Sequence, residues 1–198
     1  DDYLQILARL HALPLAPFVE GGIMRAPTPE QSGLLGMERY ERNWRSMKQV
    51  PDPFTEFSLG WLRRNPPQSK GREAAIVWDS GQFHHADGRI VAVLDVEIGH
   101  IGDPEMDLAA WRQRDTVIGY GHMAKLYDRY SELAGRELDL DALQRHHFFF
   151  CFQTGQQLGA HGDFATHVQA LARVAYCFRS GDDKQADDVA ARSGLVSI

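Results

Sequence analysis

The sequence has few cysteines, no long apolar run and no excess of positive charge. Its two cysteines, Cys151 and Cys177, both lie in apolar segments with helical spacing. Two buried thiols in a reducing compartment are therefore expected, and a disulfide framework is not. No apolar segment reaches the roughly 20 residues that a membrane-spanning helix needs, and no signal-peptide pattern is found. These absences predict a cytoplasmic protein.

The charge balance is acidic, with 21 Lys and Arg against 27 Asp and Glu, a formal net charge of −6. This argues against non-specific binding to nucleic acid or to a membrane, although a local basic pocket for an anionic substrate is compatible with it. The 198 residues predict one domain with a real hydrophobic core. The sequence leaves the oligomeric state open, with a homodimer among the alternatives.

Residues 74–111 contain most of the informative patterns. The apolar run Ala74–Trp78 predicts a buried strand. A second strand is expected before the turn dipeptide Asp87-Gly88, and a third from Arg89 to Leu94, because Asp-Gly between such runs is typical of a hairpin. Gly102-Asp103-Pro104 then predicts a turn into a helix.

Two acids, Asp95 and Glu97, follow the third predicted strand. Acids at the end of a buried strand cost free energy unless something pairs with them. One solution is a hard cation such as Mg²⁺, which binds carboxylate and phosphate oxygens. The other is that Asp95 caps a loop while Glu97 is solvated, and the pattern alone favours this second interpretation.

A family resemblance changes that balance. The run Val93-Leu94-Asp95-Val96-Glu97, followed by Gly102-Asp103-Pro104 and Asp107-Leu108-Ala109, resembles the aminoglycoside phosphotransferase family, a branch of the protein-kinase-like fold. That family carries I/L-D-W-E and then G-D-P-x-x-D-L-A. Its first Asp holds Mg²⁺, like the Asp of a kinase Asp-Phe-Gly motif. Val96 stands where the family usually has Trp.

The resemblance implies roles for these acids. Asp95 would be the metal ligand and would contact the cofactor. Glu97 matches a structural position two residues further on, and Asp103 and Asp107 match positions that mainly brace the catalytic loop.

The catalytic loop itself matches less well. The family carries His-Gly-Asp-x-x-x-x-Asn, with the Asn thirteen residues before the Mg²⁺ ligand, where this chain has Gln82. Gln82 offers the same amide oxygen to a metal, one methylene further out. An ungapped alignment places Val77 at the catalytic Asp, whereas the nearest acid is Asp79, three positions before Gln82 instead of five. Either the loop is shortened and Asp79 is the catalytic base, which we adopt, or the base is absent.

The first helix also matches the family. Asp2-Tyr3-Leu4 through Leu10-His11-Ala12-Leu13 resembles the opening helix of the family's C-terminal lobe. The resemblance then implies that residues 1–198 form a single C-terminal lobe. The ATP-binding N-terminal lobe, with its Lys and glycine-rich loop, would not be among these residues.

Other segments are predicted from local signals. Residues 14–28 are expected to be a loop, and Thr28 is expected to cap a helix to about Lys48, with Gln31 completing a capping box. Arg39, Arg42 and Arg45 are interpreted as a solvated basic face of that helix, paired with Glu38 and Glu41. Further helices are expected at Pro53–Arg64, Thr116–Ala134, Leu138 to about Leu158, Phe164–Arg179 and Asp182–Ala191. Asp52-Pro53 is expected to start the first of these, and either Asp139 or Asp141 is expected to cap the third.

Three other candidate sites are set aside. The histidines, including His84-His85 and His146-His147, lack the spacing of a zinc site. The string from His161 to Phe164 spells the family's loop, but it follows the predicted metal ligand and no strand follows it. Asp79-Ser80-Gly81 is similar to a serine-protease loop, yet nothing else supports a triad with Ser80 as nucleophile.

The sequence thus predicts a mainly helical α+β fold, a kinase-like C-terminal lobe with a small hairpin region that carries the active-site acids. The resemblance implies transfer of the γ-phosphoryl group of ATP, with Mg²⁺, to a hydroxyl of a small molecule. Two alternatives stay open. One is a catalytically impaired kinase-like module that binds a ligand or a partner protein, and the other is a helical interaction domain with structural acids.

Overall fold

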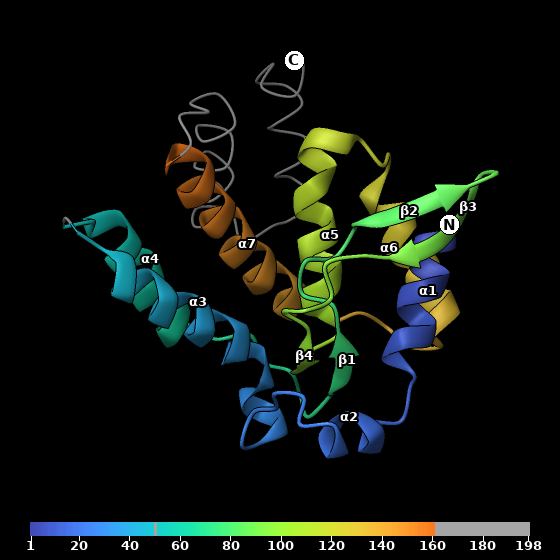
Figure 1. Cartoon of the computed structure of the whole chain (residues 1–198), viewed down its shortest axis with the longest axis horizontal. Coiled ribbons are helices and arrows are strands. Elements are labelled where there is room, and N and C mark those ends of the chain that lie inside the picture. Colours follow the sequence, from blue (N-terminus) through green and yellow to red (C-terminus); the bar gives the residue numbers. More distant parts are fainter. Residues whose placement is uncertain (50, 161–198) are drawn as a thin grey trace.

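The computed structural model describes residues 1–49 and 51–160, and these are mainly helical with two small antiparallel sheets (Figure 1). The predicted mainly helical α+β fold is confirmed at this level. The elements are α1 (Asp2–His11), α2 (Ala16–Glu20), the 3₁₀ helix η1 (Pro29–Leu34), α3 (Leu35–Met47), α4 (Pro53–Arg64), β1 (Ala74–Ile76), β2 (Phe83–Ala86), β3 (Arg89–Val93), β4 (His100–Gly102), α5 (Glu105–Ile118), α6 (Met123–Ala134) and α7 (Leu140–Ala160).

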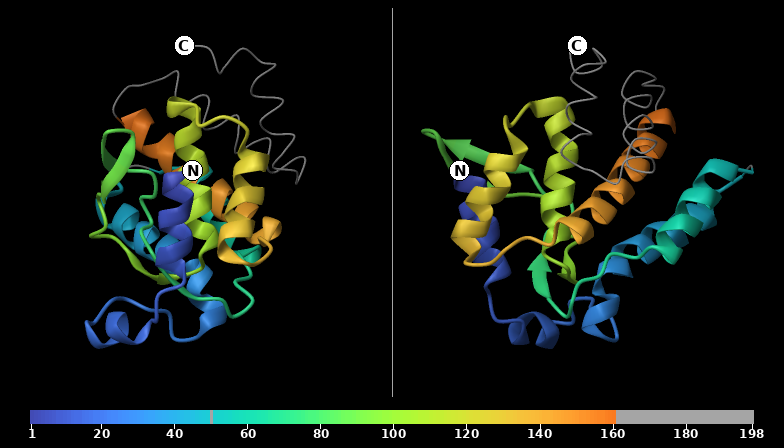
Figure 2. Two further views of the ribbon diagram at one scale, coloured as in Figure 1. Left: turned by 90° about the vertical axis from the view of Figure 1, so that its right-hand side faces the viewer. Right: turned by 180° about the vertical axis from the view of Figure 1, so that it is seen from behind.

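Helix α5 lies at the centre of the described chain (Figures 1 and 2). It packs most extensively against α7, while α1 packs against α6 on the other side. Helices α3 and α4 run alongside each other, beyond α7 as seen from α5. Because the two sheets lie beside α5, the loop between β1 and β2 is held against this helix.

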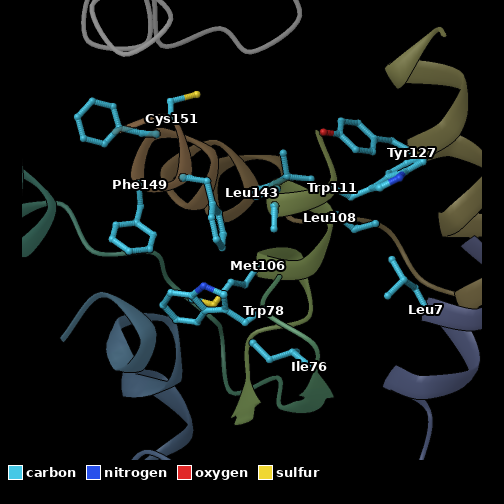
Figure 3. Packing of buried hydrophobic residues seen from close by; sticks show 14 of the residues in the cluster. Leu7, Ile76, Trp78, Met106, Leu108, Trp111, Tyr127, Leu143, Phe149 and Cys151 are labelled. Atoms are coloured by element: carbon cyan, nitrogen blue, oxygen red, sulfur yellow. The ribbon is translucent and has the colours of Figure 1, made fainter. Parts of the chain in front are cut away.

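A buried apolar cluster joins these elements (Figure 3). Leu7 of α1, Leu108 of α5 and Leu143 of α7 are fully buried. Burying a side chain of this size contributes about 1.5–3 kcal/mol. Trp78 and Phe149 extend the cluster toward α3. This apolar packing therefore positions α5 against α1 and α7.

The β2–β3 hairpin is formed as predicted. Phe83 pairs with Val93 and Ala86 with Arg89, with an irregularity between His84 and His85. At the turn, Asp87 has φ 50° and Gly88 φ 75°. Positive φ at both central residues is the geometry of a type I′ turn, which explains the Asp-Gly signal.

Strand β1 is shorter than predicted, because it ends at Ile76 instead of Trp78. It pairs with β4, so that Ala74 faces Gly102 and Ile76 faces His100. The next two backbone N–H groups leave the ladder and bind a carboxylate of α5 instead. Trp78 also has φ 70°, which is incompatible with a continuing strand.

Three helix predictions need correction. Residues 14–28 include the short helix α2. The predicted capping box at Thr28 is wrong: the Thr28 side chain caps no backbone N–H in the described chain, and η1 precedes α3. The predicted helix from Thr116 is two helices, because α5 continues to Ile118 and ends at Gly119 with φ 70°, and α6 begins at Met123. Glycine at a left-handed C-terminal position stops a helix.

Other local predictions are confirmed. Asp52 caps α4 by accepting a hydrogen bond from the Thr55 N–H at 3.0 Å. Asp139 caps α7 in the same way, with the Ala142 N–H at 3.1 Å. Each carboxylate satisfies one N–H at a helix start.

The basic face of α3 is only partly solvated. Arg45 pairs with Glu41 at 2.7 Å, as expected for positions four apart. Arg39 instead donates to the Ile98 carbonyl at 2.5 Å, and its guanidinium lies 4.7 Å from the centre of the Trp78 ring. Arg39 is therefore part of the packing around β4.

Several predictions fall on other residues. The helices predicted at Phe164–Arg179 and Asp182–Ala191, the string that begins at His161, and Cys177 lie outside the described residues. Cys151 is a buried thiol. None of the described helices is both long enough and apolar enough to cross a bilayer.

Candidate functional site

The loop between β1 and β2 brings two predicted site residues into contact. The Gln82 amide Nε2 donates to Asp79 Oδ2 at 2.5 Å. The other oxygen of this carboxylate, Oδ1, forms an ion pair with Arg114 Nη2 of α5. The Asp79 side chain is 39% exposed, so a ligand in solvent can still reach it. The short loop thus presents a carboxylate whose orientation is held from two sides.

The backbone places Asp95 at the same end of the hairpin. The Leu94 N–H donates to the Gln82 carbonyl at 3.0 Å, one step beyond the last strand pair. Asp95 is the next residue, is exposed, and has φ 55°. A left-handed conformation at a residue other than glycine costs about 1–2 kcal/mol. The chain therefore turns sharply at the residue that the sequence predicts to bind metal.

Asp107 binds the start of the loop from the first turn of α5. Its fully buried carboxylate accepts hydrogen bonds from the N–H groups of Val77 and Trp78, each at 2.8 Å. His11 Nε2 lies 3.1 Å from Asp107 Oδ2. With Nε2 donating, Nδ1 of a neutral His11 accepts from the Tyr130 hydroxyl at 2.7 Å. One carboxylate thus joins α1 and the loop to α5.

The middle of the loop is held by α1. The Gly81 N–H donates to the Tyr3 hydroxyl at 2.6 Å, and Ser80 Oγ lies 2.8 Å from the same oxygen. Burial raises the pKa of the Tyr3 hydroxyl above its ordinary value, and the charge of Asp107 adds to this. The hydroxyl therefore stays protonated at physiological pH.

Gly81 is required where the loop crosses α5. Its φ is 103°, and a Cβ there would lie 2.8 Å from Arg114 Cδ and 3.1 Å from Trp111 Cδ1. The glycine combines a backbone conformation that other residues rarely adopt with a close approach to the helix.

The Trp78 ring anchors the start of the loop. A Cβ on Gly36 would lie 1.3 Å from this ring, and the His100 ring centre is 5.3 Å away. Burial lowers the pKa of His100 to about 4, and the positive charge of Arg39 acts in the same direction. His100 is therefore a neutral packing residue at pH 7.

Asp103 and Glu105 form a buried cluster away from the loop. His146 Nε2 lies 3.2 Å from Asp103 Oδ2, and Glu105 Oε1 accepts from Arg136 Nη1 at 2.6 Å. Burial works to raise the pKa of Asp103, but the hydrogen bond and charge of His146 outweigh it and bring the pKa to about 2. These acids connect β4 and α5 to the helices behind them.

Four of the six predicted site residues therefore lie in or close to the loop between β1 and β2, and the other two lie elsewhere. Asp79 and Gln82 are in contact, and the hairpin register places Asp95 close by. Asp107 binds the start of the loop from the first turn of α5. Asp103 belongs to the buried cluster, and Glu97 is exposed in the turn after Asp95. Within the described residues, no group of three or more His, Cys, Asp or Glu side chains could hold a metal ion.

Sequence reasoning missed three residues around this loop: Tyr3 and Arg114 contact it, and His11 contacts Asp107, which binds it. Tyr3 and His11 lie on the predicted first helix, but nothing in the sequence around them indicates which distant residues their polar atoms contact. Arg114 lies 35 residues beyond Asp79, on a helix whose pattern indicates only packing. No local signal reports contacts of this range.

The fold of this chain is similar to that of three solved structures described as phosphotransferases. A structure of a protein assigned as an aminoglycoside phosphotransferase from Ralstonia eutropha JMP134 matches with a TM-score of 0.62 and 17% identity, covering 99% of this chain and 61% of that one. A macrolide 2′-phosphotransferase type I matches at 0.57 with 21% identity, covering 87% of this chain and 57% of that one.

A third structure, macrolide 2′-phosphotransferase MphH from Brachybacterium faecium, matches with a TM-score of 0.54 and 21% identity, covering 99% of this chain and 59% of that one. No protein-family model matches the sequence, and the search of curated proteins found no match. The likeness shows that the chain shares the fold of these phosphotransferases, whereas the active-site role of the acids near the hairpin stays a prediction. The chain spans about three fifths of the length of these structures.

Proposed function

We propose that this chain is the C-terminal lobe of an ATP-dependent phosphotransferase that transfers the γ-phosphoryl group of ATP to a hydroxyl of a small molecule. The observation that carries the proposal is the contact between Asp79 and Gln82 beside Asp95, at one end of a hairpin, on a fold shared with phosphotransferases. The proposal includes a second lobe, which would bind the nucleotide together with this one.

In the proposed reaction, Asp79 accepts the proton of the acceptor hydroxyl. The hydroxyl oxygen forms a bond to the γ-phosphorus, and the bond from that phosphorus to the β–γ bridging oxygen breaks, leaving ADP. The hydrogen bond from Gln82 and the ion pair with Arg114 hold the Asp79 carboxylate in place. Positioning of this kind supplies much of the rate enhancement in phosphoryl transfer.

The residues present fit a magnesium ion. Because Gln82 uses Nε2 to donate to Asp79, its amide oxygen is the atom left to act as a ligand. Asp95 is exposed, and it directly follows Leu94, whose N–H donates to the Gln82 carbonyl. One carboxylate and one amide oxygen, completed by phosphate and water oxygens, is a donor set that Mg²⁺ accepts. When bound, Mg²⁺ would neutralise charge on the phosphate oxygens.

The alternative is a catalytically impaired module that binds a ligand or a partner protein. The shortened loop favours it, because only Ser80 and Gly81 separate Asp79 from Gln82. Such a module would retain nucleotide or ligand binding without turnover. Binding and transfer must therefore be measured separately.

The decisive measurement is calorimetry of Mg²⁺·ATP on the whole chain that the gene encodes. Asp95→Asn removes the predicted ligand charge and keeps a residue that tolerates φ 55°. We expect saturable binding by the unaltered protein and its loss in Asp95→Asn. Asp128→Asn, an exposed acid on α6, is the matched control and should bind normally.

A screen of hydroxyl-bearing small molecules with Asp79→Asn as control then tests transfer. Phosphorylation of an acceptor that disappears in Asp79→Asn supports the enzyme. Binding of Mg²⁺·ATP without transfer to any acceptor favours the impaired module. If the folded whole protein does not bind Mg²⁺·ATP, both the enzyme and a nucleotide-binding module are contradicted.

A further inference from the structure

Arg114 crosses the loop between β1 and β2, where it binds Asp79 and Ser80 and passes close to Gly81. Its Nε donates to the Ser80 carbonyl at 3.0 Å, and its Nη2 pairs with Asp79 Oδ1. Its Cδ lies 2.8 Å from where a Cβ of Gly81 would stand. The side chain therefore follows the loop closely, from an element far away in the sequence.

This contact contributes little to stability. The Arg114 side chain is 30% exposed and that of Asp79 is 39% exposed. Ion pairs open to solvent contribute about 0–1 kcal/mol. Helix α5 is already fixed by fully buried residues such as Met106 and Leu108. Two polar contacts on one short loop that add little to stability leave room for a role in the chemistry of the loop.

The proposed reaction needs a cation at this point. The transferred phosphoryl group carries negative charge over its oxygens, and Asp79 is itself an anion, so the two repel each other. The loop residues Ser80 and Gly81 supply no positive charge. Arg114 does, and its planar guanidinium has five N–H donors, of which these contacts use Nε and one on Nη2.

We propose that Arg114 is a catalytic residue supplied by α5. It orients Asp79 through Nη2, and its remaining donors bind the oxygens of the transferred phosphoryl group. The inference rests on the proposed phosphotransferase function, and it adds a residue and a helix that the loop motif does not contain. The rival explanation is that Arg114 only braces the loop.

The test compares Arg114→Gln and Arg114→Lys in the whole gene-encoded protein. Arg129→Gln is the matched control, an arginine of α6 whose ion pairs are with exposed acids. Three quantities are measured: Mg²⁺·ATP affinity, release of phosphate from ATP with water as acceptor, and affinity for ADP with aluminium fluoride, a mimic of the phosphoryl group in transfer.

We expect Arg114→Gln to lower turnover at least about 100-fold, since an arginine on a transferring phosphoryl group accounts for about 10³–10⁵-fold. Affinity for ADP with aluminium fluoride should fall by a similar factor, while the Kd for Mg²⁺·ATP stays within about threefold, because the contact is made in the transition state. Arg114→Lys keeps the charge without the fork and should recover part of the loss. Arg129→Gln should match the unaltered protein.

The outcomes separate the two proposals. If the unaltered protein binds no Mg²⁺·ATP, the phosphotransferase function fails and this inference fails with it. If it binds and turns over, but Arg114→Gln keeps its turnover or loses Mg²⁺·ATP binding to the same extent, only the inference is overturned. If turnover is too slow to measure, the affinity for ADP with aluminium fluoride is the test. Equal affinity of the unaltered protein and of Arg114→Gln for this complex would overturn the inference.

Discussion

The acids at the start of α5 and the acids of the two loops beside it have opposite surroundings. Asp103, Glu105 and Asp107 are fully buried and accept hydrogen bonds from backbone and side-chain donors. Asp79 is partly exposed, and Asp95 is exposed. Buried acids must be paired to be tolerated, so they brace the fold, whereas acids open to solvent remain able to bind a ligand.

The largest expected effect is on the buried side of this comparison. Asp107→Ala would leave the N–H groups of Val77 and Trp78 without their acceptor, and His11 Nε2 without its partner. Removing one partner of a buried charged network costs about 3–5 kcal/mol. Urea unfolding of the variant should show this loss. Asp107→Asn keeps one acceptor oxygen and should lose less, and equal stability of all three proteins would contradict a bracing role.

Gly36→Ala tests the packing of the Trp78 ring against α3. The new Cβ would stand 1.3 Å from the ring, so the ring or α3 must move. Overpacking of this kind costs about 1–3 kcal/mol. Gly60→Ala on α4 is the matched control, because its Cβ meets only the end of the Arg64 side chain at 3.3 Å. Thermal unfolding should show a lower Tm for the first variant and an unchanged or higher Tm for the second.

His100 should make stability depend on pH. Its pKa is lowered from 6.5 to about 4 in the folded chain, mainly by burial and then by Arg39. The unfolded chain therefore binds more protons between these values, and the free energy of unfolding falls as pH drops from about 6.5 to about 4, by on the order of 2 kcal/mol.

The control for this effect is a residue that cannot titrate. His100→Gln should unfold with a flatter pH profile over that range, measured by urea denaturation at several pH values. His122→Gln, at an exposed histidine before α6, should keep the slope of the unaltered protein. A slope that survives in His100→Gln would assign the effect to another group.

The smallest effect on stability is expected at Asp95, the exposed acid of the comparison. Asp95→Asn should change the free energy of unfolding by no more than about 0.5 kcal/mol, as is usual for exposed positions. The same variant is expected to lose Mg²⁺·ATP binding. Calorimetry and unfolding of one preparation check both, and a stability loss as large as that of Asp107→Ala would place Asp95 among the bracing acids.

Local signals predicted the parts of this fold that depend on neighbouring residues. The Asp87-Gly88 turn, the Asp52 cap and the Asp139 cap all appear where the sequence indicates them. The Thr28 cap failed because a tight 3₁₀ turn replaced the first α-helical turn. Helix ends follow from contacts within a few residues, but several turn geometries compete for the same local pattern.

The candidate site was predicted only in part. Asp79, Gln82 and Asp95 were selected through the family resemblance, and the contact of Asp79 with Gln82 and the hairpin register bring them near one another, while their roles stay predictions. The contacts of Tyr3 and Arg114 with the loop were not predicted. Each depends on how a helix packs against the sheets.

The sequence by itself therefore determined the mainly helical composition, the hairpin and the positions of the exposed acids, because turns and caps are decided by neighbouring residues. The family resemblance implied that Asp103 and Asp107 are bracing acids, but only the tertiary structure decided which groups they contact. Asp107 meets His11 across 96 positions, and Asp79 meets Arg114 across 35. Such contacts form when α1 and α5 pack in the common core, and packing of apolar faces carries no local signal of which polar atoms will meet.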